Sequence, residues 1–362
     1  MNDKASKRIP QPDAAKALAL FAVILQHAGL DSGPFFCFMT SFHVPLFFAL
    51  SALFLNPEQS IKEHLKKRTL RLFIPYLVFS IADTAIVQAV SFIKTGGPDL
   101  PALTRYGCFF ISGFGISVLW FLAALMATEL LFVLYLKLPG LLKLCTALAD
   151  IALFVLICLN ADKLSAAFSA QDPDSSAAGF ILICLLTALA RLPLCLIVYG
   201  ISFYTAAFFR QYLSFFYALR PGVRNLLPPI SAACLLTLCA FISVKNGGGS
   251  LGMIYYGKSP VLFLLSMLTG CGGMMLLSCC ICALPVYKPF VFIGMNSLII
   301  MLTHTDFYLL TPARKLASLV SAPGGTIYFI LVLLLTLITE LPVIYVINRF
   351  FPALIGKRKA AK

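Results

Sequence analysis

Residues 13–29 read DAAKALALFAVILQHAG, an apolar run with Asp13 and Lys16 at one end and His27 near the other. A helix of this length can cross the hydrocarbon core of a bilayer. Similar runs recur along the whole chain of 362 residues, of which 60% are hydrophobic and only 12% are charged. That composition is far more apolar than the composition of a soluble domain. The sequence therefore predicts an all-α, polytopic membrane protein.

About ten segments are apolar and long enough to be transmembrane helices. We expect the first to be retained, because no convincing signal-peptide cleavage site follows it. The sixth is too long for one straight span and contains Arg191 and Pro193, so it is either a kinked helix or a short interfacial helix followed by a span. The expected spans are 14–31, 34–55, 70–93, 116–136, 141–160, 178–209, 226–245, 259–284, 290–310 and 326–348. We treat residues 1–362 as a single membrane-embedded domain, with a short basic segment at 1–12 and a tail at 352–362.

The net charge of +14 is distributed unevenly across the predicted membrane. With the N-terminus in the cytoplasm, about 20 of the 28 Lys and Arg residues fall on the inner face, which is the expected positive-inside asymmetry. Both termini are then cytoplasmic, and the location is the inner cell membrane. Topology and the anionic headgroups of the lipid bilayer explain the charge. No nucleic-acid-binding module is visible, so we expect no nucleic-acid partner.

The 12 cysteines are scattered, mostly within the predicted spans. Cys279, Cys280 and Cys282 form a cluster, but neither a nearby histidine nor paired CxxC motifs accompany them. We interpret them as small packing residues and expect no metal site.

Lys16 and His27 are 11 residues apart and therefore lie on one face of the first helix, about 16 Å apart along its axis. Lys16 sits at the cytoplasmic boundary, where Asp13 can pair with it at i, i+3 spacing. His27 lies well inside the membrane. Polar groups that face lipid are costly, so this face should line the protein interior or a water-filled cavity.

The second span, SFHVPLFFALSALFL, places His43 on the neighbouring antiparallel helix, near Pro45. We expect His27 and His43 to approach one another in the outer half of the membrane. A neutral histidine hydrogen-bonded in a packed interior is the alternative for each of them.

Arg68 and Arg71, in KKRTLRLFIPY, form an i, i+3 pair at the inner end of the third span. On one face of a helix such a pair can clamp a phosphate group. Ordinary positive-inside charge is the alternative, and for this motif alone it is the better explanation.

Further polar residues occur in the fourth and ninth spans. The fourth carries Trp120 near the outer interface and Glu129 inside the membrane. The ninth, FIGMNSLIIMLTH, places Ser297 and His304 on one face, with Asp306 close to His304. Asp83, Asp150 and Glu340 are other intramembrane carboxylates, each either a structural partner of a buried cation or a functional group.

These motifs, in this order, resemble those of the acyltransferase-3 family of integral-membrane acyltransferases. DAAK followed by ten residues and His27 is similar to the family's D-x-x-[R/K]-x10-H signature. SFHVPLFFALSALF, the R-x-x-R of Arg68 and Arg71, FIPY, LWFL and IGMNSLIIMLTH also fit. The lysine at position 16 resembles the fucose 4-O-acetylase-like branch. Ala52 departs from the glycine that the family usually has at this position, and Lys16 departs from the commoner arginine.

The resemblance implies transfer of an acyl group, usually acetyl, from cytoplasmic acetyl-CoA to a hydroxyl on a cell-envelope carbohydrate or lipid-linked sugar. It implies no permanently bound cofactor, with acetyl-CoA acting as a cosubstrate. Lys16, Arg68 and Arg71 are the expected cations for the CoA phosphates. His27 and His43 are the expected catalytic residues, His27 as general base or acyl acceptor and His43 as orienting group, oxyanion stabiliser or second proton carrier. Asp13, Trp120, Glu129, Asn296, Ser297 and His304 are the expected supporting residues.

Two other functions fit the sequence. Buried His, Glu and Asp residues in ten spans also describe a proton-coupled transporter, although the internal repeats common in transporters are not detectable. A catalytically inactive membrane partner in glycan assembly is the third possibility. The predicted outer loops 94–115, 161–177 and 246–258 are short and suited to contact a sugar, but they specify no particular one.

Overall fold

The fold was obtained as a computed structural model, which describes residues 9–171, 173, 176–218, 220–305 and 308–357. Within these residues every regular element is a helix, as the sequence predicts, so the chain is an all-α polytopic membrane protein. Most of the predicted basic segment 1–12 and the last residues of the predicted tail lie outside the described part.

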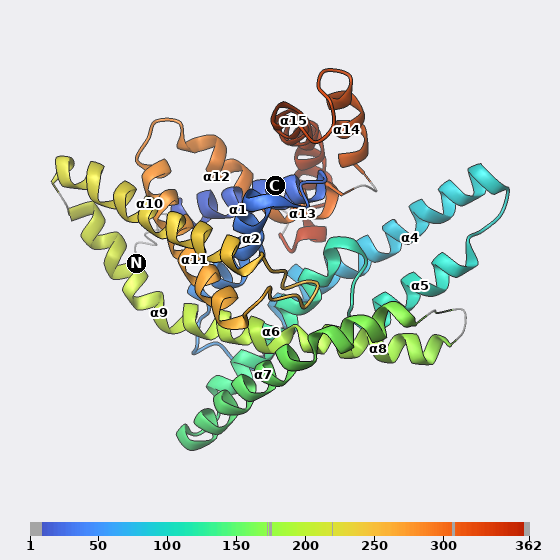
Figure 1. The fold of residues 1–362 in the computed structure, drawn as a ribbon, viewed down its shortest axis with the longest axis horizontal. Helices are drawn as coiled ribbons and strands as arrows, with labels where there is room; N and C mark the ends of the chain where they lie inside the picture. Colours follow the sequence, from blue (N-terminus) through green and yellow to red (C-terminus); the bar gives the residue numbers. More distant parts are fainter. Residues whose placement is uncertain (1–8, 172, 174–175, 219, 306–307, 358–362) are drawn as a thin grey trace.

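The helices follow one another along the chain with short connections (Figure 1). They are α1 (Gln11–His27), α2 (Gly33–Leu53), α3 (Ile61–Arg68), α4 (Ile74–Thr95), α5 (Leu100–Ile111), α6 (Trp120–Leu136), α7 (Gly140–Ala170), α8 (Ala177–Ala190), α9 (Leu192–Ala218), α10 (Pro221–Asn246), α11 (Pro260–Cys282), α12 (Tyr287–Met295), α13 (Ser297–Thr303), α14 (Leu310–Ser318) and α15 (Thr326–Phe350). The π-helical turn η1 (Thr69–Phe73) joins α3 to α4, and the 3₁₀ turn η2 (Ser117–Leu119) precedes α6. A second 3₁₀ turn, η3 (Pro352–Ile355), follows α15.

Eight helical stretches within the described residues are long and apolar enough to cross a membrane, compared with the ten predicted segments. Two predicted spans, 14–31 and 290–310, are not among the eight. The first corresponds to α1, which has only 17 residues. The predicted ninth span is not one helix, because α12 ends at Met295 and α13 begins at Ser297, with Asn296 between them. The predicted sixth span is interrupted at Arg191, where α8 gives way to α9.

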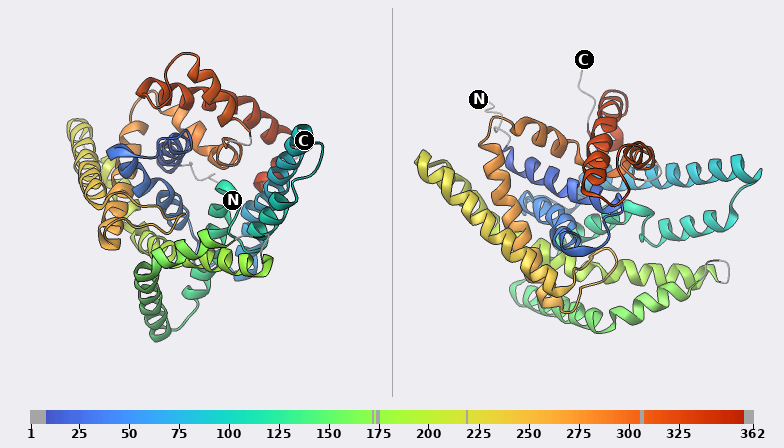
Figure 2. Two further views of the ribbon diagram at one scale, coloured as in Figure 1. Left: turned by 45° about the vertical axis from the view of Figure 1, so that its right-hand side comes forward. Right: turned by 45° about the horizontal axis from the view of Figure 1, so that its top comes forward.

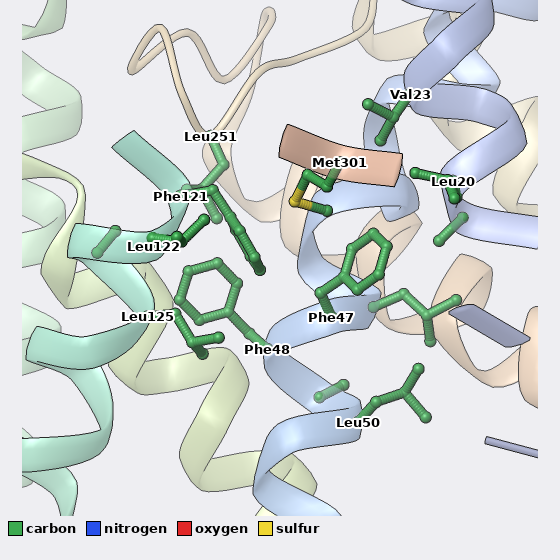
Figure 3. Packing of buried hydrophobic residues seen from close by; sticks show 14 of the residues in the cluster. Leu20, Val23, Phe47, Phe48, Leu50, Phe121, Leu122, Leu125, Leu251 and Met301 are labelled. Atoms are coloured by element: carbon green, nitrogen blue, oxygen red, sulfur yellow. The ribbon is translucent and has the colours of Figure 1, made fainter. Parts of the chain in front are cut away.

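Helix α2 lies at the centre of the fold and is the most buried of the eight stretches, whereas α7 is the least buried. Helix α2 packs against α1, α9, α10 and α11. Figure 3 shows Phe48 of α2 beside Phe121 of α6, and Phe47 of α2 near Met301 of α13. Burial from every side explains why α2 is apolar around its whole circumference rather than on one stripe.

The outer parts of the molecule are helical hairpins. Figures 1 and 2 show α4 and α5 as a hairpin that extends away from the centre, and α10 lying along α11. Helix α4 is followed directly by Gly96, whose φ of +75° is the left-handed conformation that terminates a helix.

Helices α12 and α13 lie along α1 and so bring residues distant in sequence to the same place. Gly294 of α12 makes the close approach possible, since a Cβ atom there would lie 1.7 Å from the backbone oxygen of Asp13. From this contact the chain continues past Asn296 into α13, which delivers His304 to the end of α1.

Candidate functional site

The end of α1 and the end of α13 meet through two histidines. Nδ1 of His27 lies 2.9 Å from Nε2 of His304, and the two rings stack with centroids 5.0 Å apart and planes 7° apart. His304 is completely buried, and its Nδ1 lies 2.8 Å from the carbonyl oxygen of Ile300. The sequence places His304 near this end of its span but does not predict the contact with His27.

These contacts determine where the protons lie. A carbonyl oxygen only accepts hydrogen bonds, so Nδ1 of His304 must carry the proton. In neutral His304, Nε2 is then an acceptor, and Nδ1 of His27 must donate to it. Neutral His27 consequently carries its lone pair on Nε2, the form that can act as a base or a nucleophile.

His43 of α2 is fixed in the same way. Its Nδ1 donates to the carbonyl oxygen of Met39, one turn earlier, at 2.9 Å, which leaves the lone pair of the neutral ring on Nε2. His27 and His43 both line a cavity of about 370 Å³. The sequence predicts that His27 and His43 approach one another, and in the structure both line the same cavity. The hydrogen bond of His27, however, is made with His304.

The cavity extends from the two histidines to segments that the sequence predicts as outer loops. The loop before α6 contributes Phe114 and Gly115, and the loop between α10 and α11 contributes residues 250–253. Loop 161–177, also expected near the acceptor, contributes no residue to the lining. The lining also includes aromatic rings, hydroxyl groups and an amide: Gln26, Thr40, Phe47, Phe109, Ser117, Trp120 and Phe121.

A buried asparagine folds the loop between α10 and α11. Asn246 donates to the carbonyl oxygens of Gly248 (3.1 Å) and Tyr256 (2.8 Å) and accepts from the backbone N–H of Ser259 (2.8 Å). These bonds satisfy backbone groups that would otherwise be buried without partners. The loop is therefore a defined wall of the cavity.

Trp120, predicted near the outer interface, also lines the cavity, together with Arg191. Arg191 lies between the Phe114 and Trp120 rings, with its guanidinium carbon 4.5 Å and 5.0 Å from their centroids. The sequence marks Arg191 only as a break in a span; a cation within an apolar segment was the signal that it faces the protein interior.

At the other end of α1, Lys16 donates to Asp13 at 3.3 Å, the i, i+3 pair that the spacing predicts. The Asp13 side chain is almost completely buried, whereas 30% of the Lys16 side chain is exposed. Lys16 therefore remains accessible to an anion from solvent.

Arg68 and Arg71 lie in different environments. Arg68, the last residue of α3, forms an ion pair with the fully buried Glu129 of α6, which also accepts from Ser51 of α2. His64 lies 3.9 Å from the same carboxylate. Glu129 is therefore the partner of a cation, one of the two roles left open for the intramembrane carboxylates.

Arg71 lies in η1, where the N–H of Ile74 donates to the carbonyl oxygen of Thr69. This wider π turn replaces the regular helix that the sequence predicts, so i, i+3 spacing no longer puts Arg68 and Arg71 on one face. Arg71 is exposed and lies against Gly356, which follows η3.

The remaining predicted residues support the packing of α12 to α15. Asn296 accepts a hydrogen bond of 3.0 Å from Asn348, and Ser297 begins α13 half-buried. Glu340 accepts from the hydroxyl of Thr303, at 2.9 Å from each carboxylate oxygen. Asp306 lies outside the described residues.

Two other carboxylates are in different settings. Asp83 accepts a hydrogen bond of 2.7 Å from Tyr308. Asp150 lines a second, mostly apolar cavity between α6, α7 and α9.

A further residue not singled out from the sequence is Arg314 of α14, which donates to the carbonyl oxygen of His27. A cation at this position stabilises the C-terminal end of α1.

Comparison with known proteins gives one match. The family model of the acyltransferase-3 family, described as an acyltransferase domain, matches residues 9–345. No curated protein and no solved structure matches the chain.

Proposed function

Because the chain belongs to the acyltransferase-3 family of membrane acyltransferases, we propose that it transfers acetyl from cytoplasmic acetyl-CoA to a hydroxyl of a cell-envelope sugar or lipid-linked sugar. The single observation that carries the proposal is the hydrogen bond between His27 and His304 beside the cavity that His43 also lines. It leaves His27 with a basic nitrogen, Nε2, and holds its ring in one orientation.

In the proposed reaction, Nε2 of His27 removes the proton from the acceptor hydroxyl as the hydroxyl oxygen attacks the thioester carbonyl carbon. The carbon–sulfur bond then breaks, and the imidazolium returns the proton to the thiolate of CoA. The products are the acetyl ester and free CoA. His304 accepts from Nδ1 of His27 throughout, and so stabilises the imidazolium by orienting its N–H toward an acceptor.

His43 is the second base at the cavity. With its lone pair on Nε2, it can carry the proton between the acceptor and the thiolate if their positions relative to His27 differ. A covalent route, in which Nε2 of His27 takes the acetyl group before the acceptor arrives, uses the same atom and the same tautomer.

The donor is proposed to bind at the cytoplasmic end of α1. Lys16 and Arg71 are at least partly exposed, and cations of this kind bind phosphate by charge-assisted hydrogen bonds. Arg68 contributes its remaining guanidinium donors while Glu129 holds it in place. About 16 Å of helix between Lys16 and His27 suits an extended pantetheine arm.

The acceptor is proposed to enter from the opposite side, between the loop before α6 and the loop between α10 and α11. Aromatic rings can stack on a sugar ring, and hydroxyl and amide groups can bind its hydroxyls; the cavity offers both. We place the chain in the fucose 4-O-acetylase-like branch on the strength of the lysine at position 16.

The test is acetyl transfer by the purified protein in lipid nanodiscs. Radiolabelled acetyl-CoA is supplied with envelope glycans from a strain that lacks this protein, and the glycans are analysed for O-acetyl esters. The proposal predicts new base-labile esters with the wild type and none with His27→Ala. Absence of any transfer by folded wild-type protein would leave the inactive-partner function as the better account.

A further inference from the structure

Arg191 stands at the junction of α8 and α9 and is almost completely buried, at 3% exposure. Its Nε donates to the carbonyl oxygen of Gly252 at 2.9 Å, and its Nη1 donates to that of Phe114 at 3.1 Å. The two bonds and the Phe114 and Trp120 rings hold the guanidinium at the wall of the cavity that His27 and His43 line.

The positive charge of Arg191 has no counter-ion in the described part of the chain. No described carboxylate forms an ion pair with it, and no aspartate or glutamate occurs among the residues that line the cavity. Carbonyl oxygens and aromatic faces solvate a guanidinium in part. They do not neutralise it, and a buried cation without an anion is costly.

The geometry also leaves donors for a ligand. A guanidinium carries more N–H groups than the two bonds to Gly252 and Phe114 use, and the planar fork matches a carboxylate or a phosphate. The lining around it includes Ser250 and Ser117, the latter with a φ of +49°, a conformation that L-residues adopt rarely and that is typical of functional sites.

We propose that the acceptor sugar bears an anionic group, a carboxylate or a phosphate, and that Arg191 binds this group inside the cavity. The inference rests on the proposed function and adds the chemical class of the acceptor. The bound anion supplies the missing counter-charge, and its fixed position brings a hydroxyl of the same sugar to the histidines. A neutral sugar of the same shape would leave the cation unpaired.

A purely structural role for Arg191, as a clamp between two loops, makes a different prediction. A clamp affects stability but gives no preference between charged and neutral sugars. The discriminating readout is therefore ligand preference, and the protein contains its own probe. Trp120 is the only tryptophan of the chain, and its ring contacts Arg191.

The experiment titrates the purified wild-type protein in nanodiscs, without acetyl-CoA, and records Trp120 fluorescence. The probes are glucuronate, glucose 1-phosphate and glucose, with sodium chloride added to equal ionic strength. We expect a saturable change at a concentration at least about tenfold lower for an anionic sugar than for glucose. The first two probes distinguish a carboxylate from a phosphate. Equal responses to charged and neutral sugars, or no saturable response to either anionic sugar, would overturn the inference.

The matched variants are Arg191→Gln and Arg191→Lys, each checked for a monodisperse gel-filtration profile. We expect Arg191→Gln to abolish the preference for anionic sugars and Arg191→Lys to retain part of it. A folded Arg191→Gln protein with the wild-type preference would contradict the assignment; if neither variant folds, the wild-type comparison decides. The titration contains no acyl donor, so its result is independent of the acetyl-transfer assay. Binding of anionic sugars in the titration, together with no acetyl transfer in that assay, would refute only the proposed function. Transfer to neutral sugars with no anionic preference would refute only this inference.

Discussion

Nδ1 of His27 lies 2.9 Å from Nε2 of His304, although 277 residues separate the two in the sequence. His304 in turn donates to the carbonyl oxygen of Ile300. In many enzymes with a nucleophilic residue, a catalytic base is held in orientation by a hydrogen bond to a third group. These two hydrogen bonds form a similar arrangement, in which the third group is a neutral imidazole. In the proposed mechanism, His304 is a positioning residue and His27 is the residue that reacts.

Replacement of His304 should separate positioning from binding. In His304→Ala the acceptor for Nδ1 of His27 is lost, and we expect kcat to fall by about 10²-fold or more with little change in the KM for acetyl-CoA. His304→Gln offers an amide oxygen in a similar place and should recover part of the rate. Steady-state kinetics of folded protein test this. Equal rates for Ala and Gln variants would argue against an orienting hydrogen bond.

The tautomer of His27 can be observed directly. Nitrogen NMR of protein labelled at its four histidines should show Nδ1 of His27 protonated and Nε2 unprotonated in the resting state. The His27→Gln spectrum assigns the signal by its absence. In His304→Ala the signal should change toward a mixture of tautomers. Protonated Nε2 in the wild type would contradict the hydrogen-bond directions derived from Ile300.

The buried ion pair of Arg68 and Glu129 should matter for stability. Glu129→Gln or Arg68→Gln leaves one group of the pair without its partner, and we expect each to lose about 3 kcal/mol, seen as a lower melting temperature in detergent. The double variant, which removes both charges, should recover most of the loss. If the two single losses simply add in the double variant, the groups do not interact.

Arg71 should act on the donor instead. We expect Arg71→Gln to raise the KM for acetyl-CoA by about tenfold, the cost of one lost charge-assisted contact, and to reduce the salt dependence of that KM. The melting temperature should change little, because Arg71 is exposed. Lys62→Gln on α3 is the control for a lost surface charge. An unchanged KM for Arg71→Gln would remove this residue from the donor site.

Gly294 should be intolerant of a larger side chain. A Cβ atom there would collide with the backbone of Asp13, so Gly294→Ala must push α12 away from α1. We expect a loss of about 1–3 kcal/mol and a lower melting temperature. Gly272→Ala, where the Cβ meets only Leu235 at 3.5 Å, is the matched control and should be close to neutral. Equal melting temperatures for the two variants would contradict the close α1–α12 packing.

Local patterns predicted the helical character of the fold and some of the contacts near the candidate site. Apolar segment lengths give the long helices, and spacing along a helix gives the pair of Asp13 and Lys16. The approach of His43 to His27 follows from the short connection between α1 and α2. Each of these depends on residues close together in sequence.

The partners from distant helices could not be predicted in this way. His304 reaches His27 only because Gly294 lets α12 lie against α1. The π turn at η1 separates Arg68 from Arg71 where Arg68 meets Glu129 of α6, and i, i+3 spacing alone assumes a regular helix. Arg191 is visible in the sequence as a charge in an apolar segment. Its place beside Trp120, at the cavity that the histidines also line, depends on how two loops fold over that cavity.

The most direct measurement is the acetyl-transfer rate of His27→Ala beside that of the wild type. Both are prepared in nanodiscs, matched for gel-filtration profile and melting temperature, and supplied with the same acetyl-CoA and acceptor glycan. We predict that the variant loses at least about 10²-fold in kcat because Nε2 of His27 is the atom that takes the proton of the acceptor hydroxyl in the proposed reaction. A folded His27→Ala protein that transfers acetyl at the wild-type rate would contradict the assignment of His27 as the reacting residue.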